Sequence, residues 1–255
     1  MPIRNTAWPT GTPCWVDLGT PDVQAARSFY TAVLGWEYGG GDGEPGGYAM
    51  CRTGGRDTAG LGPQQDPADP PRWTTYFAAD DVDATAARVT AAGGTLLAPP
   101  MDIGPAGRMA IAADPQGNPF GLWQAGTTTG VQVYNEPGAL IWNEAAVDDP
   151  AAARDFYSRV FGFAWEEIPD SGGYATFATA GRPLGGLVGM SPGLPKGWST
   201  CFAVADTDAA VQAVEAAGGK VLMAAEDSPY GRFAIVADPW GAAFSVMSGM
   251  EETAD

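Results

Sequence analysis

The sequence predicts an α+β protein built from two tandem halves, each made of two βαβββ units. The first observation is a repeat, because the segment from Pro13 to Trp36 returns in altered form from Leu140 to Trp165. The second is composition, since 36 Gly and 22 Pro are too many for a helical bundle and indicate many turns and short strands. The third is length, because 255 residues divide into two halves of ordinary domain size.

Each copy of the repeat begins with a strand and continues into a helix. Residues 14–19 alternate apolar and polar side chains in the manner of a strand, and residues 22–34 carry apolar side chains at helical spacing. Asp22 is a helix-start residue and Gly35 a helix-stop residue. In the second copy Asp149 is the expected N-cap, followed by a proline at the first helical turn.

The remaining elements complete four units. After the first helix we expect three strands, at residues 36–38, 47–52 and 58–61. A second unit follows, with a strand at 73–79, a helix at 81–92 and strands at 95–98, 108–112 and 119–124. The second half repeats this order, with a strand at 198–203, a helix at 206–217 and strands near Lys220, Arg232 and Ala243.

The repeat also sets the expected domain boundaries. We expect an N-terminal arm at residues 1–11, a first domain at 12–125, a linker at 126–137, a second domain at 138–250 and a C-terminal tail at 251–255. Four units can complete two sites within one chain, so we expect a monomer or a homodimer.

Composition limits the classes of function. A net charge of −17 argues against nucleic acid and anionic membranes as partners, because both bind basic patches. No apolar run reaches the length needed to cross a membrane, and the first ten residues lack a secretion-signal pattern. Three cysteines without metal-ligand spacing indicate a reduced, cytoplasmic protein. Histidine, the most common metal ligand and general base near neutral pH, is absent from the chain.

Three motifs occur twice, in the same order. They are the helix ends Phe29-Tyr30…Leu34-Gly35 and Phe156-Tyr157…Phe161-Gly162, the helix starts Asp80-Asp81-Val82-Asp83 and Asp206-Thr207-Asp208, and the turns Asp114-Pro115-Gln116-Gly117 and Asp238-Pro239-Trp240-Gly241. Together they resemble the vicinal oxygen chelate superfamily, which includes glyoxalase I, bleomycin-resistance proteins, fosfomycin-resistance enzymes and extradiol dioxygenases. The resemblance implies two tandem glyoxalase/bleomycin-resistance-like domains, each with its two βαβββ units curled into a cup.

The superfamily usually holds a divalent metal in the cup on three or four His, Glu or Gln side chains. The resemblance places those ligand positions at Trp15 and Trp142, at Thr75 and Thr200, and at Gly121 and Ser245. A divalent ion in a protein prefers carboxylate, imidazole or thiolate ligands, and none of the six residues offers one. We therefore expect no metal and no other cofactor in either cup.

Strand alternation adds further residues to the cups. Residues two apart on a strand share a face. The pairs expected to share a cup are therefore Trp15 with Asp17, Trp142 with Glu144, Trp123 with Gly121, and Met247 with Ser245. Each cup would combine flat apolar side chains with one carboxylate, which suits a planar or weakly basic organic molecule. The predicted ligand-binding residues are Trp15, Trp142, Thr75, Thr200, Trp123, Ser245 and Met247.

Structural roles are alternatives for most of these residues. The two tryptophans of the repeat could belong to the core, and the two carboxylates could be paired with Arg108 or Arg232 at the floor of the cup. Without such a partner, burial beside indole rings would raise the pKa of each carboxyl group and make it a candidate acid or base. Tyr48 and Tyr174 are expected to serve packing rather than chemistry.

Two functions from different classes follow. The first is a small-molecule binder, acting as a sensor or by sequestration as bleomycin-resistance proteins do, with an aromatic or cationic ligand in a metal-free cup. The alternative is a cofactor-independent isomerase, lyase or cyclase of small-molecule metabolism, in which Asp17 or Glu144 serves as general acid or base. Metal-dependent glyoxalase or dioxygenase activity would need an unfamiliar oxygen-only site, and a scaffolding role would leave the cups filled.

Overall fold

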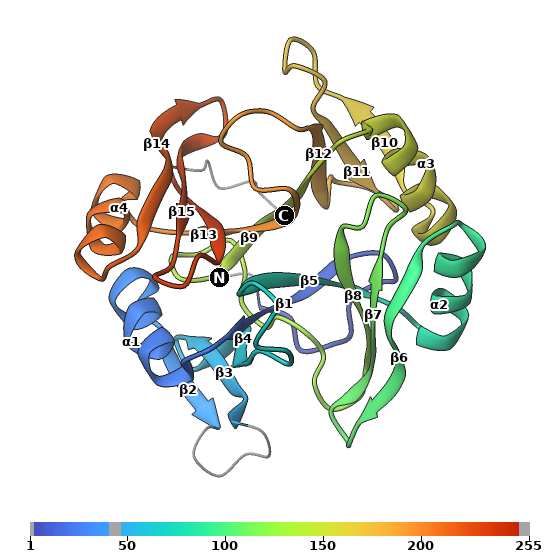
Figure 1. Cartoon of the computed structure of the whole chain (residues 1–255), viewed down its shortest axis with the longest axis horizontal. Coiled ribbons are helices and arrows are strands. Elements are labelled where there is room, and N and C mark those ends of the chain that lie inside the picture. Colours follow the sequence, from blue (N-terminus) through green and yellow to red (C-terminus); the bar gives the residue numbers. More distant parts are fainter. Residues whose placement is uncertain (1–2, 41–46, 250–255) are drawn as a thin grey trace.

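The described residues form two mixed sheets, one in each half, with two helices in each half (Figure 1). The structure is a computed structural model that describes residues 3–40 and 47–249. Each half has the predicted order of two βαβββ units, so the α+β fold class is confirmed. Among the described residues, no helix has the length and apolar character that a membrane crossing requires.

The first half supplies one sheet of eight strands. Its first unit contains β1 (Pro13–Thr20), α1 (Val23–Leu34), β2 (Glu37–Gly40), β3 (Ala49–Thr53) and β4 (Arg56–Pro63). Its second unit contains β5 (Arg72–Ala78), α2 (Val82–Ala91), β6 (Thr95–Ile103), β7 (Gly107–Ala113) and β8 (Pro119–Ala125). The strands lie in the order β2-β3-β4-β1-β5-β8-β7-β6.

The second half repeats this arrangement. Its first unit contains β9 (Leu140–Val147), α3 (Pro150–Phe161), β10 (Ala164–Glu167), β11 (Ala175–Ala178) and β12 (Gly185–Gly189). Its second unit contains β13 (Gly197–Ala203), α4 (Thr207–Ala216), β14 (Lys220–Ser228), β15 (Gly231–Ala237) and β16 (Ala243–Ser248). The strand order, β10-β11-β12-β9-β13-β16-β15-β14, is that of the first sheet.

Local sequence signals explain where the first helix of each half begins and ends. Asp22 accepts a hydrogen bond from the backbone N–H of Ala25, and Asp149 caps α3 in the same way. Gly35 and Gly162 follow the helices with φ of 71° and 76°, the left-handed conformation that glycine adopts without strain.

One strand departs from expectation. The strand predicted at residues 95–98 continues as β6 to Ile103, through Pro99 and Pro100. Proline normally ends a strand because it cannot donate a hydrogen bond, but β6 is the edge strand of its sheet and its register shifts between Ala98 and Met101. An edge strand with a bulge tolerates the two prolines.

The two units of each half are joined through their first strands. β1 pairs antiparallel with β5, and β9 pairs antiparallel with β13. The units therefore pair within each half, which the sequence left undecided. Figure 1 shows both sheets curled, with one cup open toward the lower edge of the view and the other toward the upper edge.

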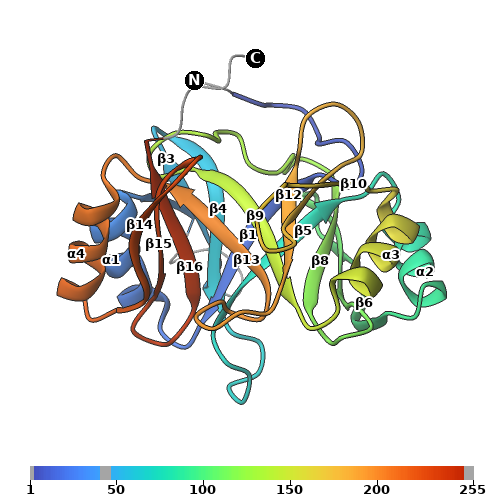
Figure 2. The same ribbon diagram turned by 90° about the horizontal axis from the view of Figure 1, so that it is seen from above.

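The helices, by contrast, pair across the halves. α1 packs beside α4, and α2 beside α3, at opposite ends of the molecule (Figure 2). One apolar core joins the first unit to the last, with Phe29 and Tyr30 packed against Phe244. The other core joins the second unit to the third, with Phe120 packed against Tyr157. Each core therefore draws mainly on one unit from each half.

Buried hydrogen bonds reinforce this interlocking. The indole N–H of Trp73 donates to the Tyr30 hydroxyl at 3.1 Å, and that hydroxyl donates to the Asp238 carboxylate of the other half at 3.2 Å. The mirror contact, at 2.8 and 3.2 Å, joins Trp198, Tyr157 and Asp114. The Asp-Pro-x-Gly turns, expected to be simple tight turns, thus anchor one half on the other.

The arm and the linker lie together beside the first sheet. Ile3 pairs with Val133, and the Val131 N–H donates to the carbonyl of Cys14. The two sheets span residues 13–125 and 140–248, inside the predicted domains of 12–125 and 138–250. The predicted tail, 251–255, lies outside the described residues.

Candidate functional site

The first cup contains a chain of hydrogen bonds that ends on a carboxylate. Trp15 and Asp17 share one face of β1, opposite Tyr76 and Thr74 of β5. The Trp15 Nε1–H donates to the Tyr48 hydroxyl at 3.0 Å, and this hydroxyl donates to Asp17 Oδ2 at 3.3 Å. The Tyr76 hydroxyl donates to the same oxygen at 3.1 Å. Because an indole N–H only donates, the chain runs from tryptophan to carboxylate.

The second cup contains the same chain without the third donor. Trp142 and Glu144 share one face of β9, opposite Cys201 and Ser199 of β13. The Trp142 Nε1–H donates to the Tyr174 hydroxyl at 2.7 Å, which donates to Glu144 Oε2 at 3.0 Å. The tyrosine–carboxylate pair is therefore common to both cups, whereas the residue facing the tryptophan differs.

Glycines make room for Tyr48 and Tyr174, the tyrosines that link tryptophan to carboxylate in the two cups. A Cβ atom on Gly60 of β4 would lie 1.7 Å from the Tyr48 hydroxyl, and one on Gly186 of β12 would lie 1.9 Å from the Tyr174 hydroxyl. Any larger residue at either position would displace the ring. The tyrosines expected to serve packing are thus held by the strand beneath them and aimed at the carboxylates.

Burial shifts both carboxyl groups toward the protonated form. The pKa of Asp17 is raised from 3.8 to about 7 by burial, although the hydrogen bonds from Tyr76 and Tyr48 act in the opposite direction. Burial also raises the pKa of Glu144, opposed by the hydrogen bond from Tyr174. Carboxyl groups that titrate near neutral pH can accept or release a proton under physiological conditions.

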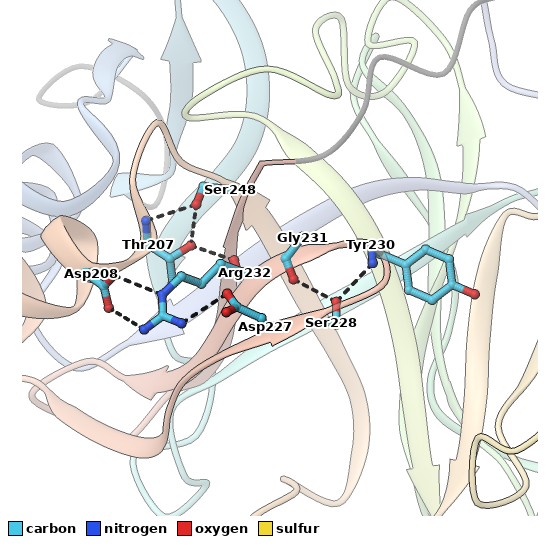
Figure 3. Close-up of polar contacts among 8 residues, drawn as sticks. All are labelled: Thr207, Asp208, Asp227, Ser228, Tyr230, Gly231, Arg232 and Ser248. Carbon is cyan, nitrogen blue, oxygen red and sulfur yellow. Dashed lines mark hydrogen bonds and ion pairs between the residues drawn. The ribbon is translucent and has the colours of Figure 1, made fainter.

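The alternative pairing of these carboxylates with arginine is wrong. Figure 3 shows Arg232 between Asp208 of α4 and Asp227 of β14, at 2.9 and 3.1 Å. Arg108 makes the equivalent ion pairs in the first half, with Asp83 and Asp102. Both guanidinium groups serve these partly exposed pairs. The carboxylates of the cups are held by hydroxyl groups instead.

The expectation that Thr75 and Thr200 line the cups is also wrong. Both lie on the opposite face of their strands, toward the other half, where the Thr75 hydroxyl donates to the Asn143 side chain at 2.9 Å. The positions that the resemblance implied are therefore one residue away from the cup face on both strands. The neighbours that face the cups are Thr74 and Ser199, one residue earlier.

Strand parity places the remaining predicted residues on the cup faces. Ser245 and Met247 pair with Cys201 and Ala203 of β13, on the face that carries Glu144. Trp123 pairs with Ala78, on the face that carries Asp17. Trp123 also lines a cavity of about 200 Å³ together with Trp8 of the arm, and neither Asp17 nor Tyr76 is among the residues that line this cavity.

Two side chains near the carboxylates were missed by sequence reasoning. Tyr76 contacts Asp17 directly, and Ser199 lines a small cavity beside Glu144. Ser199 is 8% exposed, and its hydroxyl is one of the buried polar groups of the described chain without a hydrogen-bond partner. The pairing of β5 with β1, and of β13 with β9, would have identified both.

The donors in the cups are a poor match for a divalent ion. Each cup offers one carboxylate surrounded by indole, phenol and hydroxyl or thiol groups. Within residues 3–40 and 47–249, nowhere do three or more His, Cys, Asp or Glu side chains gather in a metal-binding cluster. The thiol of Cys201 is buried, and burial raises its pKa, which disfavours the thiolate that a metal binds.

The chain matches a known family of proteins over both halves. A model described as the Glyoxalase/Bleomycin resistance protein/Dioxygenase superfamily matches residues 14–122 and again 139–246. The "Putative glyoxylase CFP32" of Mycobacterium tuberculosis is 42% identical over 260 residues, which cover 97% of this chain and 98% of that protein. The "Anthracycline biosynthesis protein DnrV" of Streptomyces peucetius is 37% identical over 260 residues, which cover 95% of this chain and 94% of that protein.

Solved structures share the fold at much lower identity. The Mn(II)-bound glyoxalase from Novosphingobium aromaticivorans superimposes with a TM-score of 0.68 at 17% identity, covering 95% of this chain and 84% of that one. The 2,2',3-trihydroxybiphenyl 1,2-dioxygenase of Sphingomonas wittichii gives 0.67 at 19% identity, covering 95% and 92%. With a family match in both halves and relatives alike over nearly their whole length, this chain belongs to the glyoxalase/bleomycin resistance protein/dioxygenase superfamily.

Proposed function

We propose that the protein binds a small organic molecule in a cup without the help of a metal ion. The observation that carries this proposal is the Trp–Tyr–carboxylate chain, which stands in both cups on equivalent strands. Such a chain presents a flat apolar ring beside a hydrogen-bonding group of defined orientation. Pockets that recognise small molecules combine these two features.

The ligand class follows from the side chains. Trp142 is partly exposed and offers an indole face, on which an aromatic ring or a cation gains affinity. Glu144 adds a carboxylate that accepts hydrogen bonds or balances a positive charge. An aromatic ligand also agrees with the naming of a relative as an anthracycline biosynthesis protein, because anthracyclines contain fused planar rings.

Metal independence is proposed on the donor set. Relatives in the fold family include a Mn(II)-bound glyoxalase, but the equivalent cup positions of this chain carry the donors described above. One carboxylate beside neutral hydroxyl groups would have to hold a divalent ion almost alone.

A titration of metal-free protein tests the proposal. After treatment with EDTA, we expect 9-aminoacridine or 1,4-dihydroxyanthraquinone to bind saturably, with heat measured by calorimetry. Trp142→Phe should weaken binding, because it removes the larger ring and the donor to Tyr174. Trp165→Phe is the matched control, since Trp165 lies on β10 and donates to the Ser158 hydroxyl outside the cup. Binding that appears only after Mn(II) or Zn(II) is added would contradict the proposal.

Proton transfer is a second candidate function, favoured by one observation. The pKa of Asp17 is raised to about 7, which suits a general acid or base at neutral pH, and burial moves the pKa of Glu144 in the same direction. In an isomerase or lyase reaction, such a group would move a proton within the bound substrate. Asp17→Asn and Glu144→Gln, made separately, should each be assayed against the substrate once it is known. Full turnover in both variants would remove these residues from the chemistry.

A further inference from the structure

The two cups differ at one pair of facing positions. In the first cup, β5 places Tyr76 opposite Gly121 of β8. In the second cup, β13 places Cys201 opposite Ser245 of β16. A large residue thus faces a glycine in one cup, and two small polar residues face each other in the other.

Tyr76 fills the first cup. A Cβ atom on Gly121 would lie 2.0 Å from Cδ1 of Tyr76, so the ring lies directly against the backbone of β8. The Tyr76 side chain is buried, and its hydroxyl donates to Asp17. Together with Tyr48, it supplies Asp17 with two donors from within the protein. The space and the carboxylate oxygen that a ligand would use are both occupied by the chain itself.

The second cup has no such ring. Cys201 stands in the place of Tyr76 and does not reach the carboxylate of Glu144, which receives a hydrogen bond from Tyr174. A carboxylate offers about four acceptor sites, so Glu144 can still accept from a ligand. The same exchange puts a hydroxyl, Ser245, where the first cup has bare backbone.

A small cavity lies beside Glu144 in the second cup, next to Ala146 on β9. Its volume of about 10 Å³ is that of one water-sized group. Glu144 and Ser199 lie in its wall, and the other lining residues are apolar: Ala146, Val188, Leu194, Pro195 and Ile235. The Ser199 hydroxyl is more than nine-tenths buried and lacks a partner among the described residues. A buried hydroxyl without a partner costs free energy, which a ligand group would recover.

We infer that the second cup alone binds the ligand, and that the cavity between Glu144 and Ser199 receives one small hydrogen-bond-donating group, a hydroxyl or an amino group, carried on an aromatic body. This inference rests on the proposed function and adds which cup works and which group it recognises. The aromatic body lies outside the cavity, against Trp142, the next residue on the same face of β9. The first cup keeps its sheet but is closed by Tyr76.

Calorimetry with matched ligands tests the recognition of the donor. We expect 1-naphthol and 1-naphthylamine to bind with one site per chain. 1-Methoxynaphthalene, which lacks the donor and is too large for the cavity, should bind at least about tenfold more weakly, because one buried hydrogen bond is lost. Equal affinity for 1-naphthol and its methyl ether would overturn the assignment of the cavity.

Variants in the two cups test which one works. Glu144→Gln and Ser199→Ala should weaken the binding of 1-naphthol by about tenfold or more, whereas Thr74→Ala, the first-cup counterpart of Ser199→Ala, should leave the affinity unchanged. Two sites per chain, or a loss of binding through the first-cup variant, would overturn the inference while leaving the proposed function intact. Failure of every aromatic probe to bind the wild-type protein would contradict both.

Exchanging the distinguishing pair provides a second test. Cys201→Tyr combined with Ser245→Gly copies the first cup into the second and should abolish the binding of 1-naphthol. Tyr76→Cys combined with Gly121→Ser leaves the second cup untouched and should keep it. The melting temperature of each double variant shows whether it folds. If the Cys201→Tyr, Ser245→Gly protein does not fold, the single variants Glu144→Gln and Ser199→Ala test the inference instead. A folded Cys201→Tyr, Ser245→Gly protein that binds 1-naphthol normally would contradict the inference.

Discussion

At Asp17, burial and hydrogen bonding act in opposite directions on one carboxyl group. Burial favours the neutral form, whereas the hydroxyl groups of Tyr48 and Tyr76 favour the ion. Burial has the larger effect, so the pKa rises to about 7. An arginine beside Asp17 would have lowered its pKa, but Arg108 is held by Asp83 and Asp102. The Asp17 carboxylate is thus available for protonation because hydroxyl groups, and not Arg108, are its hydrogen-bond partners.

This shift predicts how stability depends on pH. The folded-state pKa of about 7 lies above the reference value of 3.8, so the folded protein binds the proton more tightly than the unfolded chain does. The contribution of Asp17 to stability is then complete at low pH and is lost as the pH rises toward 7, by roughly 1.4 kcal/mol per pH unit between the unfolded-state and folded-state pKa values. Asp17→Asn should remove this loss.

Urea unfolding of both proteins at pH 5 and pH 8 measures the effect. The free energy of unfolding of the wild type should fall between these pH values by roughly 2 to 3 kcal/mol more than that of Asp17→Asn. Comparing the two proteins cancels the titration of all other groups, including Glu144. Parallel changes in the two proteins would show that the pKa of Asp17 is not raised.

Sequence reasoning located part of the candidate site and missed the rest for a physical reason. Strand alternation along β1 and β9 is regular, so placing Asp17 with Trp15 and Glu144 with Trp142 needed only the sequence. Placing Tyr76 and Ser199 needed the register between strands, which the register shifts near the starts of β1 and β9 alter. A single residue of error in register moves a side chain to the opposite face.

At the scale of elements, each half fastens the start of its second helix to its sheet by a different side chain. In the first half the Val82 N–H donates to the Gln124 side chain at 3.0 Å. In the second half the Thr207 N–H donates to the Ser248 hydroxyl at 3.2 Å, and the Thr207 hydroxyl donates to the carbonyl of Arg232 at 2.6 Å (Figure 3). Two different residue pairs thus solve the same capping problem.

Thr207→Val tests the energetic value of this network. Valine stands at the equivalent position of α2 and is fully buried there, so the shape is tolerated. The loss of the hydroxyl leaves the Arg232 carbonyl without this donor and should cost about 1 to 2 kcal/mol in the free energy of unfolding. Thr90→Val, at an exposed position of α2, is the control and should change stability by less than about 0.5 kcal/mol. An equal effect of the two substitutions, measured by urea unfolding, would contradict this account.

At the scale of the whole molecule, the sheets and the cores divide the chain differently. Each sheet belongs to one half, but each apolar core draws mainly on one unit from each half. The sequence repeat predicted the order of elements within each unit, because that order is local, but it left open how the units pair into sheets. It could not predict that α1 packs beside α4, since the apolar faces of the four helices are too similar to specify their partners.

Interlocked cores predict that neither half is stable alone as a monomer. A fragment of residues 1–137 would expose the side chains that pack against the other half, including Phe29, Tyr30 and Phe120. We expect it to be unfolded or to dimerise, with a second copy replacing the missing half. The full chain should unfold in a single transition. Light scattering and circular dichroism measure both, and a folded monomeric fragment would contradict the prediction.

The interlocked cores also bear on how the two cups can change over time. Because each core depends on both sheets, a chain in which one cup lost its ligand could not discard that half without unfolding. Trp142 and Met247 of the second cup belong to neither core, whereas Trp15 and Tyr76 of the first cup are part of one. Substitutions at these positions of the second cup are therefore constrained by the ligand rather than by folding. Tyr76 opposite Gly121 fits such a history: a pocket that no longer binds a ligand can be filled by a side chain while its sheet is retained to support the sheet of the other half.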